Sequence, residues 1–312
     1  MYKRTHHQQI ATILAYLNPL YLMEHQCFFG GGTAIALRYG EFRESVDIDF
    51  LISDIGLYGK VRNDIRDHHD LSPLLLPGKT LELIRELRTD QYGIRTVIGI
   101  GEAKIKLEII SEGRISFDLP EPKEFIDGIP SLTRLDSIAS KLLVNSDRYA
   151  DDSVYSLDLI DLAMIKPTKK ELHLAMEKAK KAYGDSIQRD LVRSIDYLFR
   201  REKRLDKCTD YLKIDLPVSV IYQKIKKSFQ SFRNILQTIV GCKFGDFYYP
   251  FFNQYNFHAV SDKYLKLVEC IVNNLKKQII QSHVIMLINE NPMLNISKLK
   301  SPVTLSQRII TI

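Results

Sequence analysis

The sequence predicts an α+β fold, in which a β-sheet with flanking helices occupies residues 1–166 and a mainly helical second domain occupies residues 167–312. Three observations support this division. Short runs of β-branched and aromatic residues, typical of strands, occur in the first part. Apolar residues recur at helical spacing through the second part. Between the two parts, Pro167 is followed by Thr168-Lys-Lys-Glu171, a capping-box pattern that opens a helix.

Composition indicates an ordinary globular protein, with 45% hydrophobic and 26% charged residues. No apolar run approaches the roughly 20 residues that cross a bilayer, and no secretory signal pattern follows Met1. The four cysteines are far apart and lack Cys-x-x-Cys spacing, which predicts free thiols in a reducing cytoplasm rather than disulfides or a zinc site. They are Cys27, Cys208, Cys242 and Cys270.

Charge is distributed unevenly between the two parts. Residues 166–312 hold 26 Lys and Arg against 13 Asp and Glu, a net charge of +13, whereas residues 1–165 hold 18 against 25, a net charge of −7. A basic half beside an acidic one fits a polyanionic substrate such as RNA. Helices whose lysines only make one face solvent-exposed, with no ligand, would give the same net charge, so both interpretations stay open.

The most informative stretch is residues 27–52. An apolar start leads into Gly30-Gly31-Gly32 and then into a short helical run from Thr33 to Tyr39. Backbone N–H groups at a glycine-rich turn that opens a helix form a binding site for phosphate. The sequence therefore predicts a phosphate-binding turn here.

A predicted strand, Val46 to Ile52, follows this turn. Residues two apart on a strand share a face, so Asp47 and Asp49 lie on one face, opposite Ile48 and Phe50. Two adjacent carboxylates repel each other, and Mg²⁺ is the simplest partner for such oxygen ligands. A phosphate-binding turn followed by paired aspartates is what metal-assisted transfer from a nucleoside triphosphate requires.

The remaining elements of the first part are assigned by periodicity. Residues 8–22 predict an amphipathic helix interrupted at Pro19, preceded by His6 and His7 as surface residues. Residues 54–70 predict a polar helix whose acidic and histidine-rich end is interpreted as solvated rather than metal-binding. A short amphipathic helix is expected over 79–88, with Leu81, Ile84 and Leu87 buried.

Residues 94–100 and 103–110 predict a β-hairpin with Gly101-Glu102 at its turn. Glu108 lies on the polar face of the second strand. It is a candidate third carboxylate beside the aspartate pair, and the alternative is a surface ion pair with Lys104 or Lys106.

Two further predicted helices carry candidate residues. The helix over 132–144 has its apolar side opposite Lys141, which spacing alone would leave as a solvated lysine. The helix from Leu157 to Met164 places Asp158 and Asp161 on one face, three residues apart.

The second part predicts helices over 169–183, 186–205, 217–240 and 262–288. The basic run Arg200–Lys207 could bind phosphates or end a helix in solvent. Eight Phe and Tyr residues lie in 244–257, where they could stack on nucleobases, although a loop packed on the core is favoured.

Gly31-Gly32-Thr33 followed by Arg43, Ser45, Asp47 and Asp49 resembles the signature of nucleotidyltransferases of the DNA polymerase β superfamily. More narrowly, it is similar to the AbiEii-type family, which includes toxins of abortive-infection and toxin–antitoxin pairs. The resemblance covers about residues 25–165. Glu108, Ser140-Lys141-Leu142 and Asp158-Leu-Ile-Asp161-Leu162 match its later motifs, but Leu157 stands where the family usually has a basic residue, which leaves open which aspartate matters more.

The resemblance implies a nucleotidyltransferase-type mixed sheet and a set of roles. Mg²⁺, with Mn²⁺ as the alternative ion, would be held by Asp47, Asp49 and Glu108, and the catalytic set would add Lys141 and Asp158. An acceptor oxygen would attack the α-phosphate and pyrophosphate would leave. Nucleotide binding would involve Gly31, Gly32, Thr33, Arg43, Ser45, Lys141 and Asp161.

The expected partners are a nucleoside triphosphate, an RNA acceptor and an antitoxin protein, with no membrane. Three other interpretations stay open from the residues: transfer to a small molecule or a protein, a nucleotide- or RNA-binding module without turnover, and a nuclease. The phosphate-binding turn argues against the nuclease, because a nuclease has no triphosphate to hold.

Overall fold

The computed structural model describes residues 2–201 and 203–229. Its main feature is a five-stranded sheet with the order β1-β2-β5-β4-β3, in which only the β2–β5 pair is parallel. The predicted mixed sheet is therefore confirmed. The strands are β1 (Phe28–Gly30), β2 (Ile48–Ile52), β3 (Glu82–Thr89), β4 (Gly93–Ile100) and β5 (Ala103–Ser111).

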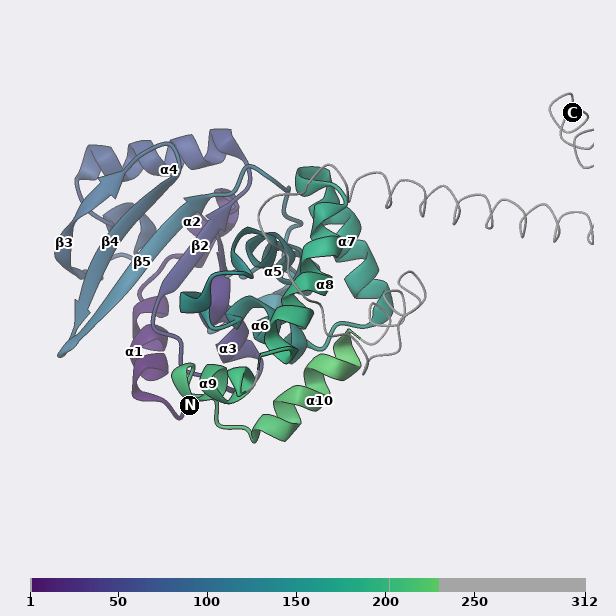
Figure 1. The fold of residues 1–312 in the computed structure, drawn as a ribbon. Coiled ribbons are helices and arrows are strands. Elements are labelled where there is room, and N and C mark those ends of the chain that lie inside the picture. Colours follow the sequence, from purple (N-terminus) through teal and green to yellow (C-terminus); the bar gives the residue numbers. More distant parts are fainter. Residues whose placement is uncertain (1, 202, 230–312) are drawn as a thin grey trace, which may run out of the picture. The chain divides into compact units, whose positions relative to one another are not determined.

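Helices flank the sheet and make up most of the described chain beyond residue 133 (Figure 1). In the first part they are α1 (Thr5–Leu14), α2 (Pro19–Glu24), α3 (Gly31–Arg38), α4 (Ile55–His68), α5 (Arg134–Arg148) and α6 (Leu157–Ile165). Beyond residue 166 they are α7 (Lys169–Tyr183), α8 (Ser186–Phe199), α9 (Arg204–Tyr211) and α10 (Val218–Ser228). Short 3₁₀ turns span Ser72–Leu74, Pro122–Glu124 and Asp152–Val154.

Strand register separates a polar row from an apolar row across the sheet. Gly30, Asp49, Glu108 and Arg95 are successive cross-strand partners, and such partners point to the same face. The neighbouring row of Phe29, Phe50, Ile109 and Ile94 faces the other way and is 0–2% exposed. The sheet thus buries one side of β2 and presents Asp49 on the other.

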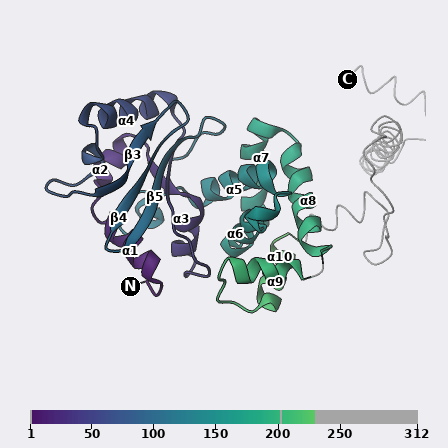
Figure 2. The same ribbon diagram turned by 60° about the vertical axis from the view of Figure 1, so that its left-hand side comes forward.

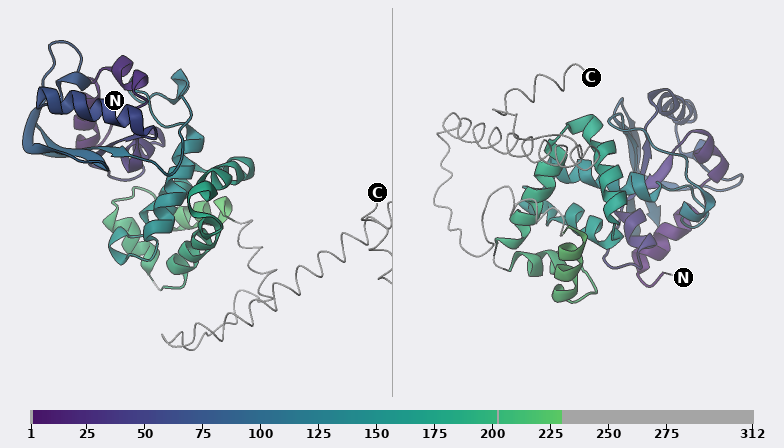
Figure 3. Two further views of the ribbon diagram at one scale, coloured as in Figure 1. Left: turned by 90° about the horizontal axis from the view of Figure 1, so that it is seen from above. Right: turned by 90° about the vertical axis from the view of Figure 1, so that its right-hand side faces the viewer.

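Two apolar clusters cover the two sides of this arrangement. One packs α1, α2 and α4 against the sheet, and the other joins β1 and α3 to α5–α10. Figure 2 shows α5–α10 gathered on the side of the sheet where α3 lies, and in both views of Figure 3 the teal and green helices again form a group beside the purple and blue part. Because the second cluster runs from Phe28 to Phe229, it crosses residue 166, and a domain boundary between 166 and 167 stays a prediction.

Helix ends follow their local sequence. Asp54 accepts a hydrogen bond from the Leu57 amide at the start of α4, and Thr133 accepts one from the Asp136 amide at the start of α5. The capping box predicted at Thr168 and Glu171 is present and opens α7. The helices predicted over 8–22, 132–144 and 157–164 are all confirmed, the first divided at Asn18-Pro19 into α1 and α2.

The helix predicted over 79–88 is wrong, because this segment forms β3 and pairs with β4. Leu81, Leu83 and Leu87 are partly buried against the sheet-side cluster, whereas Ile84 is 40% exposed. The same leucines fit a period of two as well as a helical one, and pairing with the hairpin decides between them.

Two smaller predictions also need correction. The helix expected over 186–205 is divided into α8 and α9, and Lys203 at the break has a left-handed φ of 55°. His7, expected at the surface, is fully buried, and its Nδ1 lies within hydrogen-bond distance of Glu41. The predictions for 262–288 and for the aromatic segment 244–257 lie outside the described residues, as does the end of the helix expected over 217–240.

Candidate active site

The glycine turn joins β1 to α3, and two of its residues have a side chain of another element where their own Cβ would lie. A Cβ on Gly31 would overlap the carboxylate of Asp49, and a Cβ on Gly32 would overlap the guanidinium of Arg43. Gly31 also has a φ of 67°, a conformation that favours glycine. The turn backbone therefore lies directly against two charged groups of opposite sign, at the N-terminus of an eight-residue helix.

The carboxylates predicted to bind metal come from β2 and β5. Asp49 and Glu108 are direct partners in the parallel pair, and Asp47 precedes β2 by one residue. Burial raises the pKa of Asp49 to about 6, helped by the negative charges of Asp47 and Glu108. Burial likewise raises the pKa of Asp47. Asp47 and Glu108 are thus close enough to Asp49 to raise its pKa.

Glu108 already has cationic partners. Its carboxylate lies 2.6 Å from Lys106 Nζ and 3.1 Å from Arg95 Nε. The surface ion pair with Lys106 that the sequence offered as the alternative is thus present, although the register also places Glu108 beside Asp49. Asp47 and Asp49 form no ion pair with any residue in 2–201 or 203–229.

Within the described chain, no three His, Cys, Asp or Glu side chains are grouped so that they could hold a metal ion as they stand. Asp47 and Asp49 nevertheless fit a hard divalent cation, because they supply only oxygen donors, are mutually destabilising and lack a cationic partner. Glu108 would join them by giving up its contact with Lys106.

Thr33 and Ser45 shape the loop before β2. The Thr33 side chain is buried, and its hydroxyl donates to the Asp47 carbonyl and lies 2.8 Å from the Ser45 hydroxyl. Ser45 N–H in turn donates to His7 Nε2, and His7 Nδ1 lies 2.8 Å from Glu41 Oε1. Because Nε2 accepts this hydrogen bond, Nδ1 carries the ring proton and donates a hydrogen bond to Glu41. These contacts fix the loop that carries Asp47.

A chain of five charged residues, four of them buried, begins at the glycine turn with Arg43. Arg43 donates to both oxygens of Asp161, at 2.8 and 3.0 Å. Lys141 Nζ lies 2.8 Å from both Asp161 and Asp158. Arg148 completes the chain by donating to both oxygens of Asp158, at 2.8 and 3.0 Å. We call these residues the ionic chain.

The contacts within the ionic chain change the roles expected of Lys141, Asp158 and Asp161. Lys141 is 7% exposed, so it is not the solvated lysine that its position on the helix alone would give. The side chains of Asp158 and Asp161 are 3% and 0% exposed and bind only cations of the chain. Burial alone would raise the pKa of Asp158, but the charges of Lys141 and Arg148 lower it to about 2. Asp158 is thereby held ionised and is a poor proton acceptor.

The structure thus brings the predicted site residues together around the turn. Gly31 contacts Asp49, Gly32 contacts Arg43, and the charge of Lys141 lowers the pKa of Asp49 against the larger effects of burial and neighbouring carboxylates. Sequence reasoning missed His7 and Arg148. Arg148 follows Lys141 by seven residues on one helix, and this two-turn spacing is the signal that could have identified it.

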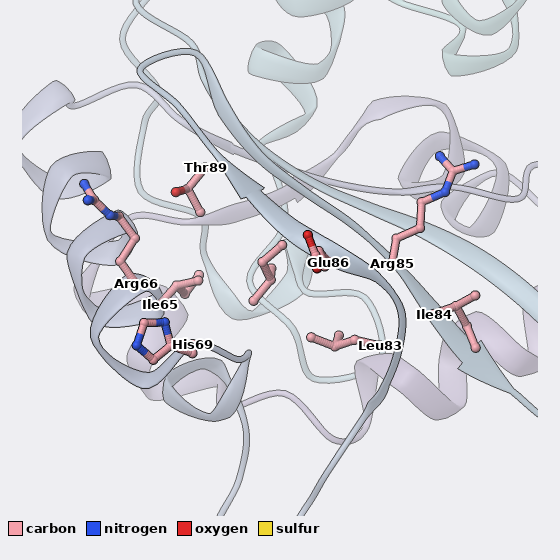
Figure 4. A pocket seen from close by; sticks show the side chains of 9 residues that line it. Ile65, Arg66, His69, Leu83, Ile84, Arg85, Glu86 and Thr89 are labelled. Carbon is pink, nitrogen blue, oxygen red and sulfur yellow. The ribbon is translucent and has the colours of Figure 1, made fainter.

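Other charged groups and cavities lie away from these residues. A cavity of about 700 Å³ between α4 and β3 is lined by Arg66, His69 and residues 83–87, and contains no predicted site residue (Figure 4). The acidic and histidine-rich end of α4 is exposed, as predicted. In the basic run, Arg201 and Arg204 both bind Asp152 and stack over Tyr197.

The mixed sheet, with carboxylates of β2 against a glycine turn, has the arrangement that the sequence predicted for a nucleotidyltransferase-type fold. The sequence matches the family described as "Nucleotidyl transferase AbiEii toxin, Type IV TA system" over residues 12–236. The chain belongs to this family and is a nucleotidyltransferase, as the sequence motifs predicted.

Solved structures with similar folds include two bacterial proteins. JHP933 from Helicobacter pylori is 18% identical, and the similarity covers 77% of this chain and 97% of that one, with a TM-score of 0.39. MenT4, a nucleotidyltransferase toxin from Mycobacterium tuberculosis H37Rv, is 16% identical over 74% of this chain and 86% of that one, with a TM-score of 0.41. No curated protein matches significantly. In the described part of the chain, every helix is too short or too polar to cross a membrane.

Proposed function

We propose that this nucleotidyltransferase moves a nucleoside monophosphate from a nucleoside triphosphate to RNA, as the toxin of a toxin–antitoxin pair. The observation that carries the proposal is the contact between the glycine turn and Asp49, which places a phosphate-binding backbone beside two carboxylates that lack a cation. The family match supports the toxin role and, with it, an antitoxin partner. A cytoplasmic location, where buried Cys27 and Cys208 stay reduced, belongs to the same proposal.

In this proposal, each group of residues would have a separate role. The α3 N-terminus at Gly31 and Gly32 binds phosphate oxygens through backbone N–H groups and the helix dipole. Asp47 and Asp49, with Glu108, hold Mg²⁺ or Mn²⁺, which when bound neutralises phosphate charge and polarises the α-phosphate. Thr33 and Ser45 hold the loop that positions Asp47.

In the proposed reaction, an acceptor oxygen forms a bond to the α-phosphorus while the bond to the bridging oxygen of the β-phosphate breaks. Pyrophosphate leaves with the electron pair, and the proton of the acceptor hydroxyl passes to solvent water. The ionic chain contributes positive charge next to the leaving group, through Arg43, Lys141 and Arg148. Asp158 and Asp161 orient these cations, which gives the two aspartates a shared role.

RNA is favoured as the acceptor by the net charge of +13 in residues 166–312. Internal ion pairs of Arg201 and Arg204 with Asp152 remove part of this charge from any interface. A small-molecule or protein acceptor is the second candidate, and the absence of turnover is the third.

The test is incubation with total RNA, Mg²⁺ and each α-³²P-labelled nucleoside triphosphate in turn. An Asp47→Asn, Asp49→Asn variant is the inactive comparison, and Asp67→Asn, an exposed residue of α4, is the matched control. Label entering RNA with the wild type and Asp67→Asn, but not with the double variant, would support the proposal. Pyrophosphate release without labelled RNA would favour another acceptor, and neither label nor pyrophosphate would leave a binding module.

A further inference from the structure

The cations of the ionic chain differ in what they can still bind. Arg43 is 3% exposed, and its guanidinium nitrogens are all occupied, by Asp161 and by the Glu44 carbonyl. Lys141 is 7% exposed and is shared between two buried aspartates. Each residue keeps unused N–H groups, but at 3% and 7% exposure they offer a nucleotide little access, and breaking their buried ion pairs to turn them outward is strongly unfavourable.

Arg148 is different. Its side chain is 41% exposed, and it binds Asp158 through Nε and Nη2 only. Its Nη1 has no hydrogen-bond partner within residues 2–201 and 203–229. A guanidinium can hold one carboxylate with one edge and donate to a phosphate with the nitrogen that remains.

The net charge of the ionic chain also indicates Arg148. The ionic chain contains three cations, Arg43, Lys141 and Arg148, and two anions, Asp158 and Asp161, so one positive charge is not neutralised within it. The excess is most accessible at Arg148, the exposed end. Burial lowers the pKa of Arg148, and Asp158, Asp161 and, to a smaller extent, Asp49 raise it.

We infer that Arg148 makes the direct contact with the phosphate chain of the nucleotide, and that Lys141 is a positioning residue that holds Asp158 and Asp161 in place. This inference rests on the proposed function and reverses the roles that the motif pattern implied for the lysine. Asp158 fixes the Arg148 guanidinium through Nε and Nη2, so Nη1 is held in place and available to a phosphate oxygen.

The test compares binding of inorganic tripolyphosphate and orthophosphate, each with Mg²⁺, by isothermal titration calorimetry. Arg148→Gln should weaken tripolyphosphate binding about 10- to 100-fold, the value of a lost charge-assisted hydrogen bond, and change orthophosphate binding much less. Arg148→Lys should retain the charge but lose about tenfold, because one ammonium cannot serve both Asp158 and the phosphate. Arg189→Gln, which removes an exposed arginine paired with Asp190 on α8, is the control and should bind as wild type.

A second measurement uses the wild-type protein and so does not depend on a variant folding. Phenylglyoxal modifies accessible guanidinium groups, and peptide mass spectrometry reports the modified fraction at Arg148 and Arg189. Tripolyphosphate should protect Arg148 at least fivefold and leave Arg189 unprotected.

The outcomes separate this inference from the proposed function. If the wild type transfers label to an acceptor and Arg148→Gln binds tripolyphosphate as tightly as wild type, or Arg148 is not protected, the inference is wrong and the proposed function stands. If the wild type neither transfers label nor binds tripolyphosphate, both are wrong.

Discussion

The Asp49 carboxylate occupies the space that a side chain on Gly31 would need. The contact joins the turn between β1 and α3 to the face of β2 that carries the predicted metal ligands. Residue 31 therefore has to be glycine for two reasons, its φ of 67° and this close approach.

Gly31→Ala should reduce nucleotidyl transfer by roughly 100-fold or more, because the new methyl group displaces Asp49 from its position beside the turn. Gly40→Ala is a matched control, since Gly40 has a φ of 85° but no atom lies within 4 Å of the point where its methyl group would be. The control should lose about 1 kcal/mol of stability through backbone strain and keep its activity. Equal losses of activity in the two variants would contradict the importance of the contact.

Asp161→Asn should lower the free energy of unfolding by about 3–5 kcal/mol, because it leaves Arg43 and Lys141 buried with one carboxylate fewer. Urea denaturation measures this change. Glu121→Gln, which breaks an exposed pair with Lys123, should leave the urea midpoint unchanged. A similarly small effect of Asp161→Asn would mean that the ionic chain does not support the fold.

Stability in acid should depend on Asp158. Its pKa is about 2 in the folded protein and 3.8 ordinarily, so the unfolded chain takes up this proton first as the pH falls. Its contribution, about 2 kcal/mol, should be complete above about pH 4 and lost between about pH 4 and 2.

The measurement for Asp158 is the difference in unfolding free energy between wild type and Asp158→Asn across this range. Other carboxylates titrate in both proteins and cancel in the difference. A difference that stays constant from pH 7 to pH 2 would contradict the assignment.

His7 should give a second pH dependence, at higher pH. Burial lowers its pKa from 6.5, against the raising effect of the Glu41 hydrogen bond. Because the unfolded chain binds this proton more tightly, the contribution of neutral His7 should be complete above about pH 6.5 and decline as the pH falls below it. Thermal unfolding of wild type should therefore weaken more than that of His7→Gln between pH 7 and pH 5. Protection of the Ser45 amide from hydrogen exchange, relative to the intrinsic rate at each pH, should fall over the same range in wild type, because this amide donates to His7 Nε2.

Local patterns are sufficient to predict most of the fold. The alternation around Asp49, the turn at Gly101-Glu102 and the capping box at Thr168 each depend on residues close in sequence, and each is confirmed. The segment 79–88 is misassigned from sequence because its leucines suit a helix or a strand, and pairing with β4 determines the outcome. Sequence spacing alone does not report which neighbour a segment meets.

The site is partly predictable for the same reason. Motif spacing names Arg43, Lys141 and Asp161, but not that Arg43 binds Asp161 across 118 residues of sequence or that Lys141 binds the same carboxylate. Burial of His7 and the double contact of Arg148 with Asp158 arise from packing between elements that the sequence does not place side by side. The roles assigned to these residues stay predictions until they are tested.

The ionic chain has a consequence for synthesis of the protein on the ribosome. A nascent chain that has emerged as far as β5 already contains Asp47, Asp49 and Glu108, yet Arg43 still lacks Asp161, which lies on α6. Until α6 emerges and packs, the guanidinium against Gly32 is not held and the turn is not fixed. An incomplete chain is therefore expected to be inactive. A cell that makes this enzyme is exposed to its activity only after most of the molecule has folded.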